Sequence, residues 1–256
     1  MPTQEPGRTA ASAPSAARTA RARARAEITG EILDAGRRYL ATEGASGLSL
    51  RAIARDLGMA SSAVYRYVAS RDELLTKLII EAYDSLGAAA ETAEATVDRT
   101  DLPGRWAVVC TAVRTWAIAN PNEYALIYGS PVPGYVAPTD TIAPASRVSN
   151  LLVLILIESA ERREVTTADE GRSAWSAALR PVRDVFQAEI SDSSIQTGLM
   201  VWSALFGVIS FELFGQFHNV VSEEPGDREA FFAECVRRWA HQLGLTSQGG
   251  LAGCRG

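Results

Sequence analysis

Apolar residues recur every three or four positions through most of the chain, which is the spacing of an amphipathic helix. The clearest stripe begins near Arg23 and runs through Ile28, Ile32 and Tyr39 to Gly44, a residue type that commonly ends helices. No stretch of useful length alternates apolar and polar residues as a β-strand does. Ala, Leu, Glu and Arg, all good helix formers, dominate the composition. The pattern predicts an all-α protein.

Proline and glycine divide the rest of the pattern into further helices. We expect helices over residues 50–57, 61–67, 70–94, 106–119, 145–164, 173–189, 193–217 and 227–243, with a proline-rich loop over residues 129–144. Two apolar runs are candidates for a membrane span. Residues 151–157 are too few to cross a bilayer, and residues 199–217 lack flanking basic anchors, so we expect buried helices and no membrane partner.

Composition separates the ends of the chain from its middle. Residues 1–22 are rich in Ala, Ser, Thr, Pro and Arg and show no apolar periodicity, which predicts a disordered arm. Residues 247–256 are expected to form a flexible tail. Between them the pattern predicts a first helical domain over residues 23–75 and a second over residues 76–246.

The first domain contains the spacing of a helix-turn-helix. Ser49 can cap a short helix, and Gly58 follows where a tight turn requires a positive φ that glycine adopts at little cost. Ser61 or Ser62 can cap a second short helix, and the run from Ser70 to Glu73 is a capping box that opens a longer helix. Two short helices joined by a glycine turn, after an amphipathic helix, indicate this motif.

The second short helix carries residue types that DNA recognition needs. With Val64 turned to the core, Ser62, Ala63, Tyr65 and either Arg66 or Tyr67 can face solvent. Small residues let the helix enter a major groove, Arg66 can reach phosphates or base edges, and Ala63 can touch a thymine methyl group. Arg71, at the start of the next helix, can pair with a phosphate. The alternative is that these are solvated polar residues of a small helical domain.

The uneven distribution of charge along the chain favours DNA binding by the first domain. The whole chain has a net charge of −5. Residues 1–75 contain 11 Arg and 8 Asp or Glu, whereas the rest of the chain contains 14 basic and 22 acidic residues. The positive balance of the first domain suits nucleic acid. Among the arginines of the N-terminal arm we select Arg25 as a DNA contact and assign the others non-specific electrostatic attraction.

The helix-turn-helix segment resembles the DNA-binding domain of TetR-family transcriptional regulators over about residues 26–75, with matching helix lengths, turn glycine and aromatic positions. By position, the resemblance implies DNA contacts at Ser49, Arg51, Ser61, Ser62, Ala63, Tyr65, Tyr67 and Arg71, to which the residues themselves add Arg25 and Arg66. The sequence departs from the family at Ser61, where lysine is frequent, and at Ser62, where glycine or proline is frequent.

The resemblance implies a homodimer that binds a palindromic double-stranded DNA operator and joins through its last two long helices. We place these over residues 199–217 and 231–243, where small residues permit close approach. Burial within one subunit is the alternative. The segment from Trp116 to Tyr135 is similar to a C-terminal subclass of the family often called the WHG type. That subclass implies no specific ligand.

The second domain is expected to hold a small apolar or aromatic ligand of unknown identity among its aromatic residues. The candidates are Trp106, Trp116, Tyr124, Tyr128, Trp175, Trp202 and Phe206. An apolar pocket with few polar groups is how helical bundles hold small molecules. Arg114, Glu158 or Asn150 could supply polar groups. Plain core packing is the alternative for each aromatic residue.

Together these features predict a cytoplasmic, ligand-responsive transcriptional repressor. The sequence contains no P-loop, GxGxxG, GxSxG or HExxH motif, so we expect no enzyme. Three separated cysteines and two histidines predict neither a metal site nor a disulfide scaffold, and we expect no cofactor. The alternatives are a small-molecule-binding enzyme and a DNA-binding protein without a ligand. Activation instead of repression stays open, as do the ligand, the operator and the regulated genes.

Overall fold

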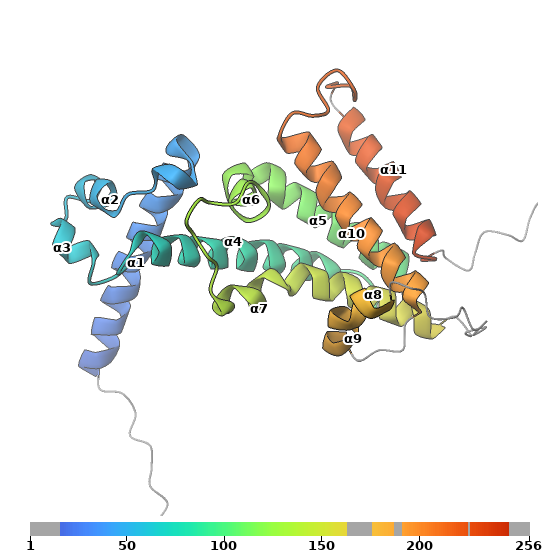
Figure 1. Ribbon diagram of the computed structural model, residues 1–256, viewed down its shortest axis with the longest axis horizontal. Helices are drawn as coiled ribbons and strands as arrows, with labels where there is room; N and C mark the ends of the chain where they lie inside the picture. Colours follow the sequence, from blue (N-terminus) through green and yellow to red (C-terminus); the bar gives the residue numbers. More distant parts are fainter. Residues whose placement is uncertain (1–15, 163–175, 187–190, 225, 246–256) are drawn as a thin grey trace, which may run out of the picture. The chain divides into compact units, whose positions relative to one another are not determined.

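The computed structural model describes residues 16–162, 176–186, 191–224 and 226–245, and within these ranges all regular structure is helical. The helices form two compact units, residues 1–75 and 76–256. Figure 1 shows the elements of each unit along the chain. The all-α prediction is confirmed for the described residues.

The first unit is built from three helices and the start of a fourth. They are α1 (Ala16–Glu43), a 3-10 turn η1 (Ala45–Gly47), α2 (Leu50–Asp56), α3 (Ser61–Val64) and the first residues of α4 (Arg71–Glu94). Their core consists of fully or almost fully buried aliphatic side chains: Ile32, Leu33, Ala35, Leu48, Leu50, Ile53, Val64, Val68, Leu74 and Leu75. Each helix therefore buries one apolar stripe against the others, as its spacing predicts.

Three local predictions for this unit were wrong in detail. The helix α1 begins at Ala16, before the expected Arg23, because Ala and Arg are strong helix formers even without an apolar stripe. Residues 1–15 of the expected arm lie outside the described residues. The residue before α3 is Ala60, so neither Ser61 nor Ser62 caps it. The helix also ends at Val64, because the amides of Arg66 and Tyr67 bond the carbonyls three residues back, those of Ala63 and Val64, instead of four.

The predicted capping box at the start of α4 is present. The Ser70 hydroxyl oxygen accepts a hydrogen bond from the Glu73 amide at 3.0 Å, and the Glu73 carboxylate accepts one from the Ala69 amide at 2.6 Å. The first bond satisfies an amide that a helix start leaves without a partner, and the second holds the amide of the residue just before the cap.

Replacing Ser70 by alanine should lower the free energy of unfolding by about 1 kcal/mol, the usual value of an N-cap. Urea unfolding of the full chain measures the change. Ser46→Ala, which alters another exposed serine of the same unit, is the control. An equal loss in both variants would contradict a capping role for Ser70.

The second unit is a helical bundle around one central helix. Besides α4 it contains α5 (Leu102–Ala119), α6 (Pro121–Tyr128), η2 (Thr139–Thr141), α7 (Ile142–Ala145), α8 (Arg147–Arg162), η3 (Ser176–Leu179), α9 (Arg180–Phe186), α10 (Asp192–Leu213) and α11 (Asp227–Gln242). Helix α5 contacts α6, α8, α10 and α11 (Figure 1) and buries Val109, Cys110 and Val113 completely. The last helix begins at Asp227 as expected, and Gly226 occupies its N-cap position.

Two buried arginines hold this bundle together. Arg105 on α5 is 1% exposed and donates to Glu94 on α4 and to Glu158 on α8, at 2.6 Å in both cases. Arg114 on α5 donates two hydrogen bonds to Glu212 on α10, at 2.7 and 2.5 Å. These bonds to Glu212 raise the pKa of Arg114. Charge pairs satisfied in this way are the form in which buried ions are tolerated.

Candidate DNA-binding surface and aromatic core

The turn between α2 and α3 is set by local hydrogen bonds. The Ser49 hydroxyl oxygen accepts from the Ala52 amide at 3.4 Å, which confirms Ser49 as the cap of α2. Gly58 has a φ of 64°, and the Met59 amide beyond it donates to the Ala54 carbonyl at 2.8 Å. A residue with a side chain would be strained at Gly58, so the turn requires glycine. The turn fixes where α3 begins.

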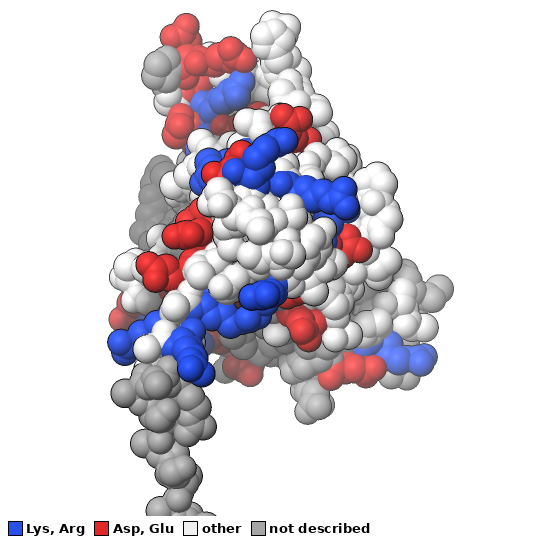
Figure 2. All heavy atoms as spheres, turned by 90° about the vertical axis from the view of Figure 1, so that its left-hand side faces the viewer, with Lys and Arg blue, Asp and Glu red and all other residues white. Residues whose placement is uncertain are grey.

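Helix α3 presents its predicted contact residues to solvent. Val64 is 0% exposed and faces the core, whereas Tyr65, just after the helix, is 45% exposed. Of the predicted DNA contacts, the exposed ones are Arg25, Arg51, Ser61, Ser62, Tyr65 and Arg66, and the half-buried ones are Ser49, Ala63, Tyr67 and Arg71. Figure 2 shows Lys and Arg side chains spread over this side of the molecule with acidic side chains between them.

Arg25 is attached to the end of the α3 turn. Its Nη2 atom donates to the Arg66 carbonyl oxygen at 2.8 Å, and its guanidinium carbon lies 5.3 Å from the centroid of the Tyr67 ring. A guanidinium that stacks on an aromatic ring and bonds a carbonyl at the same time is well held. Arg25 therefore joins α1 to the chain that follows α3.

Arg71 is also bonded within its own unit. Its Nη2 atom donates to the Ala45 carbonyl oxygen at 2.9 Å, and its Nη1 atom lies 3.5 Å from Asp72. Its side chain is 32% exposed, so part of the guanidinium is open to solvent. The position links the start of α4 to the turn after α1. Sequence reasoning found Arg71 but not this second partner, which is 26 residues away.

Part of the predicted ligand-lining set forms one cluster of aromatic rings. Tyr128 on α6 lies 5.1 Å from Tyr124 and 4.4 Å from Phe206 on α10, measured between ring centroids. Trp202 lies 5.8 Å from Phe206 and is 42% exposed. Tyr83 on α4, which was not predicted, meets Tyr128 edge to face at 6.0 Å. We call these five residues the aromatic cluster.

Polar atoms of the aromatic cluster are few and mostly paired. The Tyr124 hydroxyl lies 2.9 Å from the Ser210 hydroxyl and donates to the Phe206 carbonyl oxygen at 3.2 Å. The Tyr83 hydroxyl donates to the Ile127 carbonyl oxygen at 3.3 Å. Burial raises the pKa of Tyr128 and keeps its hydroxyl neutral. The cluster is therefore aromatic and carries no charge.

The other predicted lining residues lie elsewhere. The Trp116 indole N–H donates to the Ser85 hydroxyl at 2.9 Å, and the Trp106 indole N–H donates to the Val236 carbonyl at 3.1 Å. Trp175 lies outside the described residues. Arg114 and Glu158 are engaged in the ion pairs of the bundle, and Asn150 is exposed. The spacing of aromatic residues in the sequence does not show which of them pack in the core and which join the aromatic cluster.

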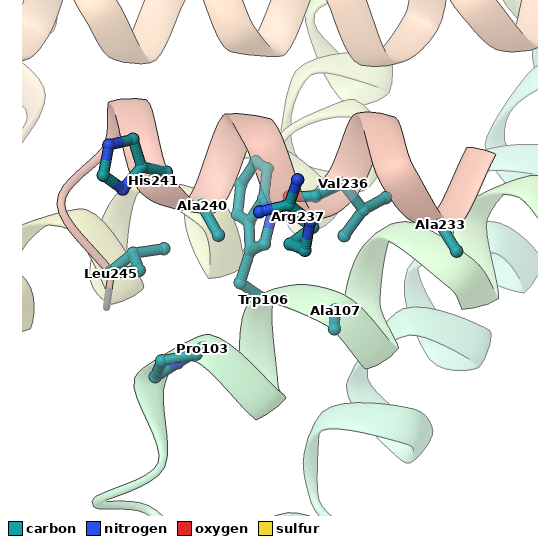
Figure 3. A pocket seen from close by; sticks show the side chains of 9 residues that line it. All are labelled: Pro103, Trp106, Ala107, Ala233, Val236, Arg237, Ala240, His241 and Leu245. Atoms are coloured by element: carbon teal, nitrogen blue, oxygen red, sulfur yellow. The ribbon is translucent and has the colours of Figure 1, made fainter. Parts of the chain in front are cut away.

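Trp106 also lines a shallow groove of about 340 Å³ between α5 and α11. Figure 3 shows the indole rising from α5 toward the residues of α11. Three alanines, Ala107, Ala233 and Ala240, leave the space, and Arg237 and His241 stand on the α11 side. Arg237 is occupied by two hydrogen bonds to Glu234, at 2.7 and 2.6 Å.

One face of α10 exposes large apolar side chains. Met200 is 66% exposed, Phe211 51% and Phe214 44%, and the positions between them include Ser203 and Gly207. We call these five residues the α10 stripe. Phe206, on the same helix, is by contrast 9% exposed within the core. By length and composition alone, Thr139–Glu161 and Asp192–Leu213 are apolar enough to cross a membrane, which core and interface helices also satisfy.

Comparisons with known proteins agree with this architecture. Residues 32–78 match the family model described as bacterial regulatory proteins of the tetR family, and residues 106–239 match a tetracyclin repressor-like C-terminal domain. The HTH-type transcriptional regulator Rv1816 of Mycobacterium tuberculosis is 41% identical over 209 residues, which are 79% of this chain and 88% of that protein.

Solved structures give the same result for the fold. The regulatory protein SCO4313 superposes with a TM-score of 0.69 at 34% identity, over 86% of this chain and 98% of that one. PfmR, a TetR-family regulator from Thermus thermophilus, superposes with a TM-score of 0.53 at 19% identity, over 82% of this chain and 97% of that one. The chain belongs to the TetR family of transcriptional regulators and carries the family's DNA-binding helix-turn-helix.

Proposed function

We propose that this protein is a ligand-responsive repressor that binds a palindromic operator as a homodimer. The observation that carries the proposal is the arrangement of α3, in which Ser61, Ser62 and Tyr65 are exposed over a fully buried Val64. Phosphate contacts by Arg51, Arg66 and the other predicted residues would position the dimer, while α3 reads base edges. Such a regulator acts on the chromosome, in the cytoplasm.

The α10 stripe supports the dimer. Apolar side chains as exposed as Met200 and Phe211 are costly to leave in water, and small residues between them let a second helix approach. Obligate dimer interfaces resemble a core cut in half. Two copies joined in this way would have to hold their α3 helices roughly 34–36 Å apart, the spacing of successive major grooves.

The aromatic cluster supports the ligand. Ring faces from α4, α6 and α10 with neutral hydroxyl groups suit a small apolar or aromatic molecule. The hydrogen bond between Tyr124 and Ser210 joins α6 to α10, the helix that carries the stripe. A ligand there releases DNA only if it binds the two spacings of the dimer with different affinity.

A fluorescence titration with promoter fragments at several salt concentrations tests DNA binding. Each neutralised phosphate should contribute about −0.9 to the slope of log affinity against log salt. We expect a slope of several units and a stoichiometry of two chains per operator. Binding that does not depend on salt, or no binding, would overturn the proposal.

Replacing Met200 by glutamine should weaken the homodimer about 100-fold, because a buried apolar side chain is worth roughly 1.5–3 kcal/mol and a homodimer loses it twice. Sedimentation at several concentrations measures the dissociation constant. Leu154→Gln is the matched control, since Leu154 is an aliphatic residue 43% exposed on α8, outside the stripe. A larger effect at Leu154 would exclude the stripe as the interface.

A further inference from the structure

The first helix extends well beyond the part of it that packs in the core. In α1 the core residues begin at Ile32, whereas residues 20–27 are exposed on every side. Figure 1 shows this N-terminal part of α1 projecting past α2 and α3. Burial therefore does not explain the extension, and its surface chemistry has to be considered.

That surface is positively charged. Over residues 16–27 the chain reads AARTARARARAE, with four arginines before the first acidic residue, Glu27. Arg21, Arg23 and Arg25 are all exposed. Figure 2 shows Lys and Arg side chains gathered at the lower end of the described part of the view. A helix whose exposed turns carry arginine and alanine offers a basic track to an anionic partner.

The arginines lie on two different faces of α1. A helix turns by about 100° per residue, so residues four apart share a face and residues two apart point in nearly opposite directions. Arg21 therefore shares the face of Arg25, about 6 Å further along the axis toward the N-terminus. Arg23 lies on the other side. We call Arg21 and Arg25 the α1 track.

Arg25 fixes which way the track points. Its contacts with the Arg66 carbonyl and the Tyr67 ring, described above, place it against the chain that follows α3. Arg21 is consequently on the side of α1 that carries the DNA-reading residues, one turn beyond them. A cation in that position meets the sugar-phosphate backbone outside the bases that α3 can reach.

We propose that the α1 track extends the DNA-binding surface, with Arg21 contacting a backbone phosphate that flanks the bases read by α3 and Arg25 acting as a positioning residue for the α3 turn. This proposal rests on the proposed function. It differs from diffuse attraction by an arginine-rich segment, because it assigns different roles to Arg21, Arg23 and Arg25.

The test compares Arg21→Gln with Arg23→Gln in the full-length protein, using salt-dependent titration of an operator with natural flanks. Loss of one phosphate contact in each subunit should reduce the log–log salt slope by about 1.8 in Arg21→Gln. We expect its affinity to fall roughly tenfold, equally for operator and unrelated DNA, as for a phosphate contact. Arg23→Gln should match the wild type.

Arg25→Gln should behave differently from both. When the α3 turn loses its tether, the ratio of operator to unrelated-DNA affinity should fall, which a loss of charge alone does not cause. Arg25→Lys should restore little of that ratio, because an ammonium group cannot stack and bond in the same way. Circular dichroism should show both variants folded.

Operator length provides a second measurement. Trimming the operator to the bases spanned by the two α3 helices should remove the difference between Arg21→Gln and the wild type. Equal slopes for Arg21→Gln and Arg23→Gln, whether unchanged or both reduced, would overturn the proposal. If the wild-type protein itself fails to bind DNA with a salt dependence, the proposed function fails instead, so the two failures are distinguishable.

Discussion

Replacing Tyr65 by alanine is expected to weaken operator binding about 100-fold and to leave the stability of the protein almost unchanged. Tyr65 is 45% exposed just after α3, so its removal uncovers no core. A side-chain contact to DNA is worth about 1–3 kcal/mol, and a homodimer loses it twice. Titration of an operator fragment and a thermal unfolding curve measure the two effects.

Val64→Ala is the matched control, because Val64 is adjacent in sequence but 0% exposed. It should lower the free energy of unfolding by roughly 1–3 kcal/mol through lost packing and retain affinity wherever the protein is folded. Two adjacent residues thus allow the effect of a surface contact to be measured separately from the effect of core packing. If Tyr65→Ala bound the operator as tightly as the wild type, α3 would not be the reading element.

The helix-turn-helix could be predicted because its determinants are local. The cap at Ser49, the turn at Gly58 and the box at Ser70 each depend on hydrogen bonds between residues no more than five positions apart. Hydrogen bonds between residues so close in the chain can be predicted directly from the order of residue types. For the same reason the buried position of Val64 follows from helical spacing alone.

Contacts between distant residues could not be predicted. Arg25 meets Arg66 across 41 positions, and Trp106 meets Val236 across 130. Trp106 was read as a ligand contact because its residue type fits a pocket as well as a core. The hydrogen bond of its indole N–H depends on how α5 packs on α11, which periodicity does not determine.

Helix α6 was missed because proline was read as a stop. Asn120 and Pro121 do end α5, but Pro121 is also the first residue of α6. Proline is well tolerated at that position, where its missing N–H would have no partner in any case. The error matters because α6 carries Tyr124 and Tyr128, the centre of the aromatic cluster.

The largest effect on stability is expected from Arg105→Met. Arg105 is 1% exposed, and its partners Glu94 and Glu158 are 13% and 19% exposed. Removing the buried cation leaves two carboxylates that are largely out of water with the exposed Arg99 as their shared partner, and breaking a buried pair in this way costs about 3–5 kcal/mol. At about 2–4 °C per kcal/mol for a domain of this size, the thermal midpoint should fall by roughly 6–20 °C.

The structure provides a closely matched control in Arg99. It bonds the same two carboxylates, Glu94 at 3.3 Å and Glu158, but its side chain is 64% exposed. Because exposed ion pairs contribute about 0–1 kcal/mol, Arg99→Gln should change the midpoint little. A similar fall in the thermal midpoint of both variants would show that burial does not determine how much these ion pairs contribute to stability.

A triple variant separates the pairing from the charge that remains after it is broken. If Arg105→Met destabilises mainly by leaving Glu94 and Glu158 without their buried cation, adding Glu94→Gln and Glu158→Gln should restore most of the lost stability. If the arginine instead supplies net attraction, the triple variant should stay as unstable as the single one. Recovery would mean that the ion pairs add little net free energy of unfolding. Their role would then be to fix how α4, α5 and α8 pack, because any one of these buried charges is costly without its partners.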